Sequence, residues 1–209
     1  MRTLASSAPG LLLAAAAAAC LTACASNKIV KQWGDPSRDG PGYRKVLVMT
    51  IWTEAQVRRT FEDAFAGQMK AGGIEALPSY RFIPQDGKVA REVVVKAVED
   101  SGAEALILIK FLGRGERGRE YPTGPVIAGG AVVVSDVHET YAVAWVDSPF
   151  PPASFDESIF SFQAKVFDAK SRALVWDGIA ELANPKGLRQ GSAELARLVV
   201  EALAARKML

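Results

Sequence analysis

Two short apolar runs, a further expected strand between them and two helical patterns constrain the fold of this chain more than any other feature. Apolar runs of this length are typical of strands that are covered on both faces. Their order favours right-handed connections and an at least partly parallel sheet. The expected elements are a strand over 45–52, a helix over 53–72, a strand over 74–83, a helix over 86–100 and a strand over 105–112.

The first helix has the clearest pattern. Thr53 and Gln56 have the spacing of a capping box, and Gly72 ends the pattern. Arg58 and Glu62 are spaced for an i,i+4 pair. Its apolar face comprises Val57, Phe61, Ala64, Phe65 and Met69. The second helix is expected to bury Val89, Val93, Ala97 and, as an open question, Val94.

The second half of the chain begins with an irregular insertion over 113–157, rich in Gly and Pro, in which 139–146 is a candidate strand. A strand over 158–168 alternates apolar and polar residues. A hairpin turn then leads to a strand over 173–182, and a helix opened by Ser192 ends the chain. We therefore expect an α/β fold, with α+β as the alternative. It forms one domain over 45–209 with a mixed β-sheet and about three packed helices.

The N-terminus has the order of a lipoprotein signal peptide. Arg2 precedes an apolar stretch that is too short to span a bilayer. The stretch closes on Leu21-Thr22-Ala23-Cys24, which has the order of a lipobox. We predict that 1–23 is cleaved and that Cys24 carries the lipid. The alternatives are lipidation at Cys20 and an ordinary secretory signal cut near Ala19 or Ala23.

Cleavage determines several properties of the mature chain. Removing 23 of the 209 residues leaves 186, enough for one self-sufficient domain. The remaining 24 basic and 23 acidic side chains argue against nucleic-acid binding. Cys24 is then the only cysteine, so no disulfide forms within the chain. The polar range 24–44 is expected to be a lipidated tether. Ala25, in place of an Asp that favours inner-membrane retention, indicates the inner leaflet of the outer membrane, facing the periplasm.

Gly113–Gly118 matches the glycine spacing of a dinucleotide-binding loop. Such a loop must open a helix whose first amides hold the pyrophosphate. Pro122 and Pro125 argue against that helix, and a periplasm-facing protein has no nucleotide supply. We expect a mobile charged loop between strands, and no cofactor.

His138 is the only histidine, and it lacks the partners of a metal site. A hydrolase pair of Ser135 and His138 is conceivable, but no nucleophile elbow accompanies it. The acidic residues form no recognisable catalytic pair and are expected to be solvated: Glu99, Asp100, Glu104, Asp147, Asp156 and Glu157. We therefore expect no catalytic residue and no metal.

The range 123–135, TGPVIAGGAVVVS, is apolar and rich in Gly. It is too short for a transmembrane helix. One interpretation is an edge strand, a hairpin or a buried loop of the same domain. The other is a surface that contacts a membrane or another subunit.

The mature chain resembles small Gram-negative envelope lipoproteins whose domain is similar to the N-terminal domain of TolB and the core of CsgG. The lipobox, the unit KVLVMT followed by Arg59–Glu62, and Leu77–Tyr80 carry the resemblance. So does the late hairpin over 166–177. The resemblance covers about 45–112 and 158–205 and implies a domain that assembles or scaffolds.

The expected function is that of a membrane-anchored, non-enzymatic binding or scaffolding module. Its partners would be the membrane, through the lipid on Cys24, and a protein, which includes self-association. The alternative that the resemblance implies is a subunit of an outer-membrane export assembly, similar to CsgG or the Pel lipoprotein. A periplasmic hydrolase would require a converging site that the sequence does not show.

Overall fold

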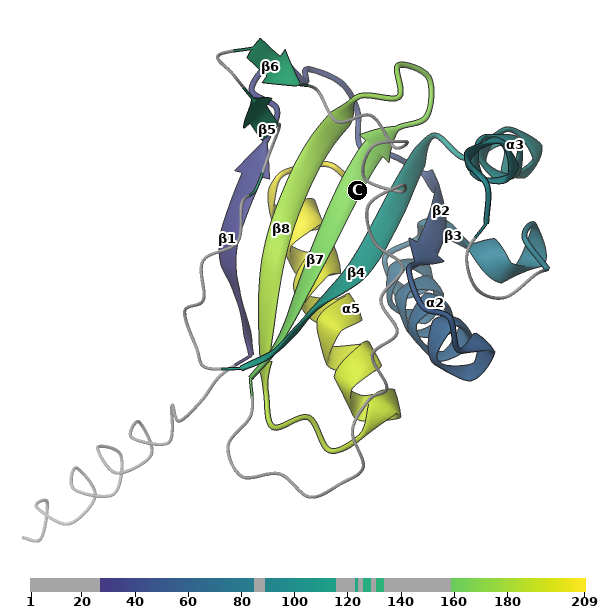
Figure 1. Ribbon diagram of the computed structural model, residues 1–209. Coiled ribbons are helices and arrows are strands. Elements are labelled where there is room, and N and C mark those ends of the chain that lie inside the picture. Colours follow the sequence, from purple (N-terminus) through teal and green to yellow (C-terminus); the bar gives the residue numbers. More distant parts are fainter. Residues whose placement is uncertain (1–26, 85–88, 116–122, 124–125, 129–130, 134–158) are drawn as a thin grey trace, which may run out of the picture.

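The computed structural model describes residues 27–84, 89–115, 123, 126–128, 131–133 and 159–209. Its main sheet contains strands β1 (Lys28–Gly34), β2 (Lys45–Thr50), β3 (Glu75–Pro78), β4 (Ala105–Gly115), β7 (Ile159–Asp168) and β8 (Leu174–Ala183). The six strands lie in the order β1-β8-β7-β4-β2-β3 (Figure 1). β2 is parallel to β3 and β4, and the remaining neighbours are antiparallel. The predicted α/β class and mixed sheet are confirmed.

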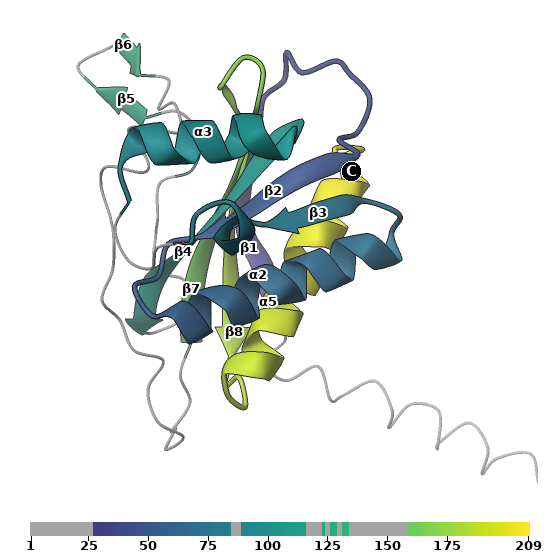
Figure 2. The same cartoon turned by 90° about the vertical axis from the view of Figure 1, so that its right-hand side faces the viewer.

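Helices cover both faces of this sheet. α2 (Ala55–Ala71) and α5 (Leu188–Ala205) pack on one face, and α3 (Arg91–Ser101) lies on the other (Figure 2). On the α2 side, the rings of Trp52 and Phe61 stack with their centroids 4.6 Å apart. The core under α3 includes Leu47, Leu106 and Val94. Continuous apolar strands are thus buried on both faces, as their sequences indicate.

The helix bounds differ from the expected ones at their starts. The N-cap of α2 is Glu54 and not the predicted Thr53, so the helix begins one residue later than the capping-box pattern predicts. α3 begins at Arg91 and fully buries Val94, whereas Val93 is only partly buried. α5 begins four residues before Ser192, because Leu188 also packs on the core.

Two strands also differ from expectation. β3 ends at Pro78, which has no N–H to donate to a ladder, and a 3-10 turn, η2 (Ser79–Arg81), follows. β4 continues to Gly115, so the first half of the glycine-rich motif lies in a strand rather than a loop. Gly113 has φ +139°, and the pairing with β7 shifts register there.

The range expected to be a tether contains β1. This strand pairs antiparallel with β8. The side-chain oxygen of Gln32 accepts hydrogen bonds from the indole N–H of Trp176 at 3.3 Å and from Nε of Arg206 at 3.0 Å. β1 is an edge strand in which Lys28, Lys31 and Gln32 are exposed, and this polar content made the range look like a linker. The folded sheet therefore begins at Lys28.

The apolar range 123–135 contains a hairpin of β5 (Val126–Ala128) and β6 (Ala131–Val133), which forms a separate two-stranded sheet. The expected hairpin is thus present. What it contacts stays a prediction. The candidate strand over 139–146 lies outside the described residues.

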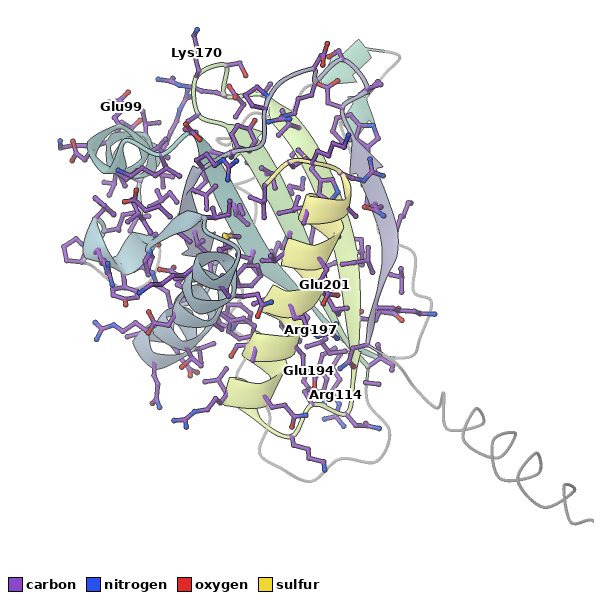
Figure 3. All side chains as sticks on the ribbon, turned by 180° about the vertical axis from the view of Figure 1, so that it is seen from behind. Glu99, Arg114, Lys170, Glu194, Arg197 and Glu201 are labelled. Atoms are coloured by element: carbon purple, nitrogen blue, oxygen red, sulfur yellow. The ribbon has the colours of Figure 1, made fainter. Side chains whose placement is uncertain are left out.

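The domain has two opposite ends (Figure 3). Glu99 and Lys170 lie at one, which we call the groove end. Arg114 and Glu194 lie at the other, where β4 and β8 finish and β1 and β7 begin. We call this second end the anchor end, after the lipid anchor that the sequence predicts just before β1.

Candidate functional site

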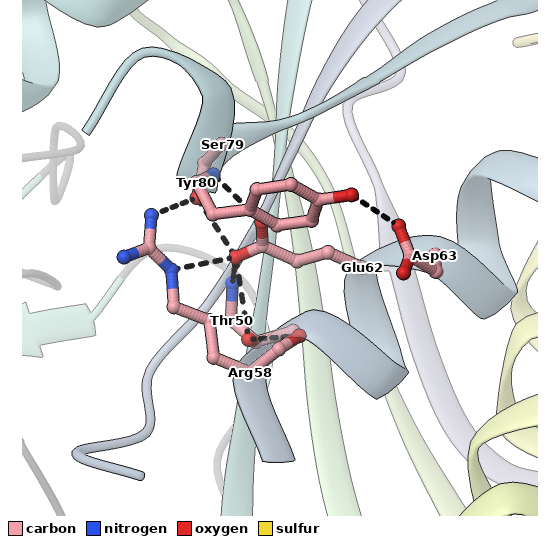
Figure 4. Close-up of polar contacts among 6 residues, drawn as sticks. All are labelled: Thr50, Arg58, Glu62, Asp63, Ser79 and Tyr80. Carbon is pink, nitrogen blue, oxygen red and sulfur yellow. Dashed lines mark hydrogen bonds and ion pairs between the residues drawn. The ribbon is translucent and has the colours of Figure 1, made fainter. Parts of the chain in front are cut away.

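A buried polar cluster lies where the parallel strands β2 and β3 finish (Figure 4). Thr50 is the last residue of β2, and Ser79 directly follows β3. α2 begins soon after β2 and presents Arg58 and Glu62, one turn apart, to both strand ends. Carboxyl ends of parallel strands are where α/β sheets usually bind ligands, so the position of this cluster makes it a candidate for chemistry.

The Glu62 carboxylate is the centre of the cluster. Its Oε1 accepts hydrogen bonds from the Thr50 N–H at 3.1 Å, from Nε of Arg58 at 3.2 Å and from the Ser79 hydroxyl at 2.8 Å. Its Oε2 accepts one from the Tyr80 N–H at 3.0 Å. Nη2 of Arg58 also donates to the Ser79 hydroxyl oxygen at 2.9 Å. Both carboxylate oxygens are therefore satisfied by the protein.

The cluster is closed to solvent. Arg58 is 3% exposed and Glu62 is fully buried. Burial raises the pKa of Glu62, while the Arg58 guanidinium and the hydrogen bonds from Ser79, Thr50 and Tyr80 act in the opposite direction. A carboxylate that no substrate reaches and that already holds its full set of donors does not act as a general base. The cluster ties α2, β2 and β3 together.

The groove end carries a surface groove of about 770 Å³. The loop before β2, the end of α3 and the turn between β7 and β8 line it. The Tyr43 hydroxyl donates to Oδ2 of Asp168 at 3.1 Å and accepts from Nε of Arg38 at 3.3 Å. The Arg38 guanidinium also lies 4.3 Å from the Tyr43 ring centroid, a cation–π contact. These contacts fix one wall of the groove.

Ionisation in this wall follows its hydrogen bonds. Burial raises the pKa of Tyr43. Partial burial pushes the pKa of Asp168 upward, but hydrogen bonds from Ser171, Tyr43 and Lys170 outweigh it, and the pKa falls below 3.8. Asp39 and Glu99 remain exposed in the groove lining. An open surface with a fixed wall and exposed side chains suits contact with another chain better than enclosure of a small substrate.

A row of charges lies on β7 and β8, on the sheet face away from α5. Asp177 is fully buried. Each of its carboxylate oxygens lies 3.0 Å from Nε2 of Gln163, which donates to both. Its Oδ2 also lies 3.9 Å from Nζ of Lys165. Burial and the Lys165 charge lower the pKa of Lys110. The alternating pattern of β7 predicts that Gln163 and Lys165 share one face of the sheet. It does not predict that Asp177 of β8 lies beside them.

The three described acidic residues that the sequence singled out, Glu99, Asp100 and Glu104, each have a partner of their own. Glu99 lies 3.6 Å from Arg172, and Asp100 pairs with Lys96 at 2.8 Å. Glu104 accepts hydrogen bonds from the backbone N–H groups of Arg44 and Lys45, so it secures the start of β2 rather than being merely solvated. The other candidates lie outside the described residues: Cys24, His138, Asp147, Asp156 and Glu157.

Sequence reasoning identified the Arg58–Glu62 spacing but not the partners of the pair on β2 and β3. Among the described residues, no group of three or more His, Cys, Asp or Glu is placed to hold a metal ion. Within the same residues, no helix is long and apolar enough to cross a membrane.

Comparison with known proteins gives only distant likenesses. No protein-family model and no curated protein matches the sequence. Among solved structures, the chain is similar to the PelC dodecamer from Paraburkholderia phytofirmans, with 15% identity, a TM-score of 0.45 and coverage of 85% of this chain and 97% of that one. It is also similar to lipoprotein GNA1162 from Neisseria meningitidis, with 13% identity, a TM-score of 0.39 and coverage of 78% and 96%.

A third solved structure is the hypothetical protein CT253 from Chlamydia trachomatis, with 12% identity, a TM-score of 0.36 and coverage of 80% and 96%. With identities of 15% or less and TM-scores below 0.5, no property of the present chain follows from these likenesses. The resemblance to TolB and CsgG in particular stays a prediction.

Proposed function

We propose that this protein is a lipid-anchored module of the bacterial cell envelope that acts by protein contact rather than by catalysis. The observation that carries the proposal is the lipobox order Leu21-Thr22-Ala23-Cys24 directly before the folded sheet. Asn27 is already part of the domain, since its Oδ1 accepts a hydrogen bond from the Ala183 N–H at 2.7 Å. The leader thus ends where the fold begins.

The arrangement of polar groups supports the non-enzymatic part of the proposal. The buried Arg58–Glu62 cluster is internally satisfied, so its natural role is structural. The groove lies at the end of the domain opposite the start of β1, where a protein partner would reach it without meeting a membrane that holds the Cys24 lipid. We place the domain on the periplasmic side of the outer membrane.

Lipidation is tested by growing cells with radiolabelled palmitate and separating membranes from soluble proteins. The wild-type chain should be labelled and remain with the membranes. Cys24→Ser should lose both label and membrane retention, because the thiol that takes the lipid is gone. The matched control is Cys20→Ser, which should behave as wild type. Label that persists in Cys24→Ser, or is lost in Cys20→Ser, would overturn the assignment.

A second candidate is a subunit of a self-associating export assembly, similar to CsgG or the Pel lipoprotein. The feature that favours it is β1, an edge strand that carries Val30, a large hydrophobic side chain 37% exposed. Light scattering on the detergent-purified protein distinguishes the two candidates. A particle several times the mass of one chain, reduced to one chain by Val30→Lys, would favour the assembly, and a monomer would exclude it.

A further inference from the structure

Three exposed basic side chains gather at the anchor end of the domain, around the starts of β1 and α5. Lys28 begins β1, Lys186 lies between β8 and α5, and Arg189 is in the first turn of α5. The segments that carry them are neighbours, because Lys28 pairs with Glu181 near the end of β8, and Lys186 follows that strand. We call these three residues the basic rim.

Among the described residues, the rim differs from other basic surface side chains in the ion pairs that it makes. Lys96 and Arg197 each pair with a carboxylate one turn away. In the part of the chain that the structure describes, no carboxylate forms an ion pair with Lys28, Lys186 or Arg189. Within the described residues, the rim therefore keeps a net positive charge.

The start of α5 adds to this positive potential. Its N-cap, Gly187, provides no side-chain hydrogen bond, and its first turn holds no acidic residue. A helix N-terminus carries partial positive charge, so Arg189 in that turn is unfavourably placed unless an anion lies nearby. The cations and the helix start therefore favour the same kind of partner.

The short segment between Cys24 and Asn27 limits the distance between the predicted lipid and the anchor end. Three residues lead from Cys24 to Asn27, which is hydrogen-bonded to the end of β8. Three extended residues span at most about 11 Å. A lipid on Cys24 would therefore hold the basic rim within reach of the headgroups of the membrane that the lipid enters.

We infer that the basic rim is a membrane-docking surface that binds the headgroups of anionic phospholipids. This inference rests on the proposed lipidation of Cys24 and adds an orientation to it. The anchor end faces the bilayer and the groove end faces away from it.

The test uses the full chain, lipidated in a bacterial host and reconstituted into vesicles with nitroxide-labelled headgroups. One set of vesicles is phosphatidylcholine, and the other contains equal parts of phosphatidylcholine and phosphatidylglycerol. A fluorophore is attached to Gln190→Cys at the anchor end or to Glu99→Cys at the groove end. Because the Cys24 sulfur carries diacylglycerol through a thioether in the lipidated protein, the introduced thiol is the one that reacts.

We expect nitroxide quenching at position 190 to exceed that at position 99, and to rise when phosphatidylglycerol is present. Lys186→Glu/Arg189→Glu should abolish the rise, since two basic side chains at an anionic surface change the ratio of docked to undocked protein by roughly 30-fold. The matched control, Lys70→Glu/Lys170→Glu, changes the same net charge away from the rim and should leave the rise intact.

The outcomes separate the two proposals. Protein that does not float with either vesicle contradicts the lipid anchor. Protein that floats with both, but shows equal quenching at the two positions or no effect of phosphatidylglycerol, contradicts the docking surface alone. A rise that both double variants abolish equally would show a general charge effect and would also overturn the assignment of the rim.

Discussion

At the scale of single residues, the closed Arg58–Glu62 cluster shows how a charged pair serves this fold. Burying two charges costs free energy, which close pairing and additional hydrogen bonds offset. Here Ser79 bonds both partners, and the backbone of β2 supplies a further donor to the Glu62 carboxylate. The pair thus fixes the position of α2 against the ends of two strands.

Removing one member of this pair should therefore be costly. Arg58→Ala leaves the Glu62 carboxylate buried without its guanidinium, and we expect a loss of about 3–5 kcal/mol in the free energy of unfolding. Urea denaturation monitored by circular dichroism measures it. The control is Lys96→Ala, which breaks an exposed pair of the same spacing and should cost less than about 1 kcal/mol. Similar losses in both variants would contradict the structural role of the cluster.

Asp168 should make stability depend on acid pH. Its pKa in the folded protein lies below the value of 3.8, so its carboxylate stabilises the fold above that pH. The contribution is lost as the pH falls through the folded pKa. The stability difference between wild type and Asp168→Asn should thus be largest near neutral pH and shrink below pH 3.8. A difference that grows on acidification would show that Asp168 does not stabilise the fold through its ionised form.

At the scale of elements, sequence patterns predicted the parallel strands and their helices because each buries a continuous apolar face. β2, α2 and β4 follow that logic directly. β1 was missed because an edge strand with charged residues has the composition of a linker. The early start of α5 was missed because Ser192 looked like a cap, whereas its hydroxyl donates to the Arg189 carbonyl inside the helix.

The candidate site was predictable only in part, since its partners come from distant segments. The spacing of Arg58 and Glu62 indicates an ion pair, but Ser79 is 17 residues beyond Glu62 along the chain. Tyr43 and Asp168 are separated by 125 positions. No local pattern reports such contacts, because they depend on how the strands are ordered in the sheet.

β1 should contribute to stability as a member of the sheet. A chain that begins at Asp35 lacks Gln32, which leaves the Trp176 indole N–H without that acceptor. Compared with a chain that begins at Asn27, we expect its thermal midpoint to fall by at least about 5 °C. Differential scanning calorimetry measures the shift. Equal midpoints would support the tether that the sequence alone suggested.

β8 contains a close contact that only glycine allows. A Cβ on Gly178 would overlap the ring of Trp176, which is fully buried. Gly178→Ala should therefore lower the free energy of unfolding by about 1–3 kcal/mol. Gly67→Ala is the matched control, because space is open there in the middle of α2, and it should raise stability by about 0.5–1 kcal/mol. Chemical denaturation of both variants tests the opposite signs.

At the scale of the whole molecule, the sheet separates two ends of the domain for which we propose different roles. Asn27 joins the sheet at the anchor end, where its side chain accepts a hydrogen bond from the Ala183 N–H. The groove lies at the other end, between the loop before β2, α3 and the β7–β8 turn. With the proposed lipid on Cys24, only three residues would link it to Asn27, and the domain would stay close to the bilayer. The proposed orientation therefore directs the groove toward partners on the side away from the membrane.

The measurement that tests this account most directly is mass spectrometry of the mature N-terminal peptide, taken from the membrane fraction. The account predicts that the peptide begins at Cys24 and carries a diacylglycerol thioether on that cysteine. A peptide that begins at Ala25 or later, or one that begins at Cys24 with a free thiol, would contradict the lipid anchor and the orientation inferred from it.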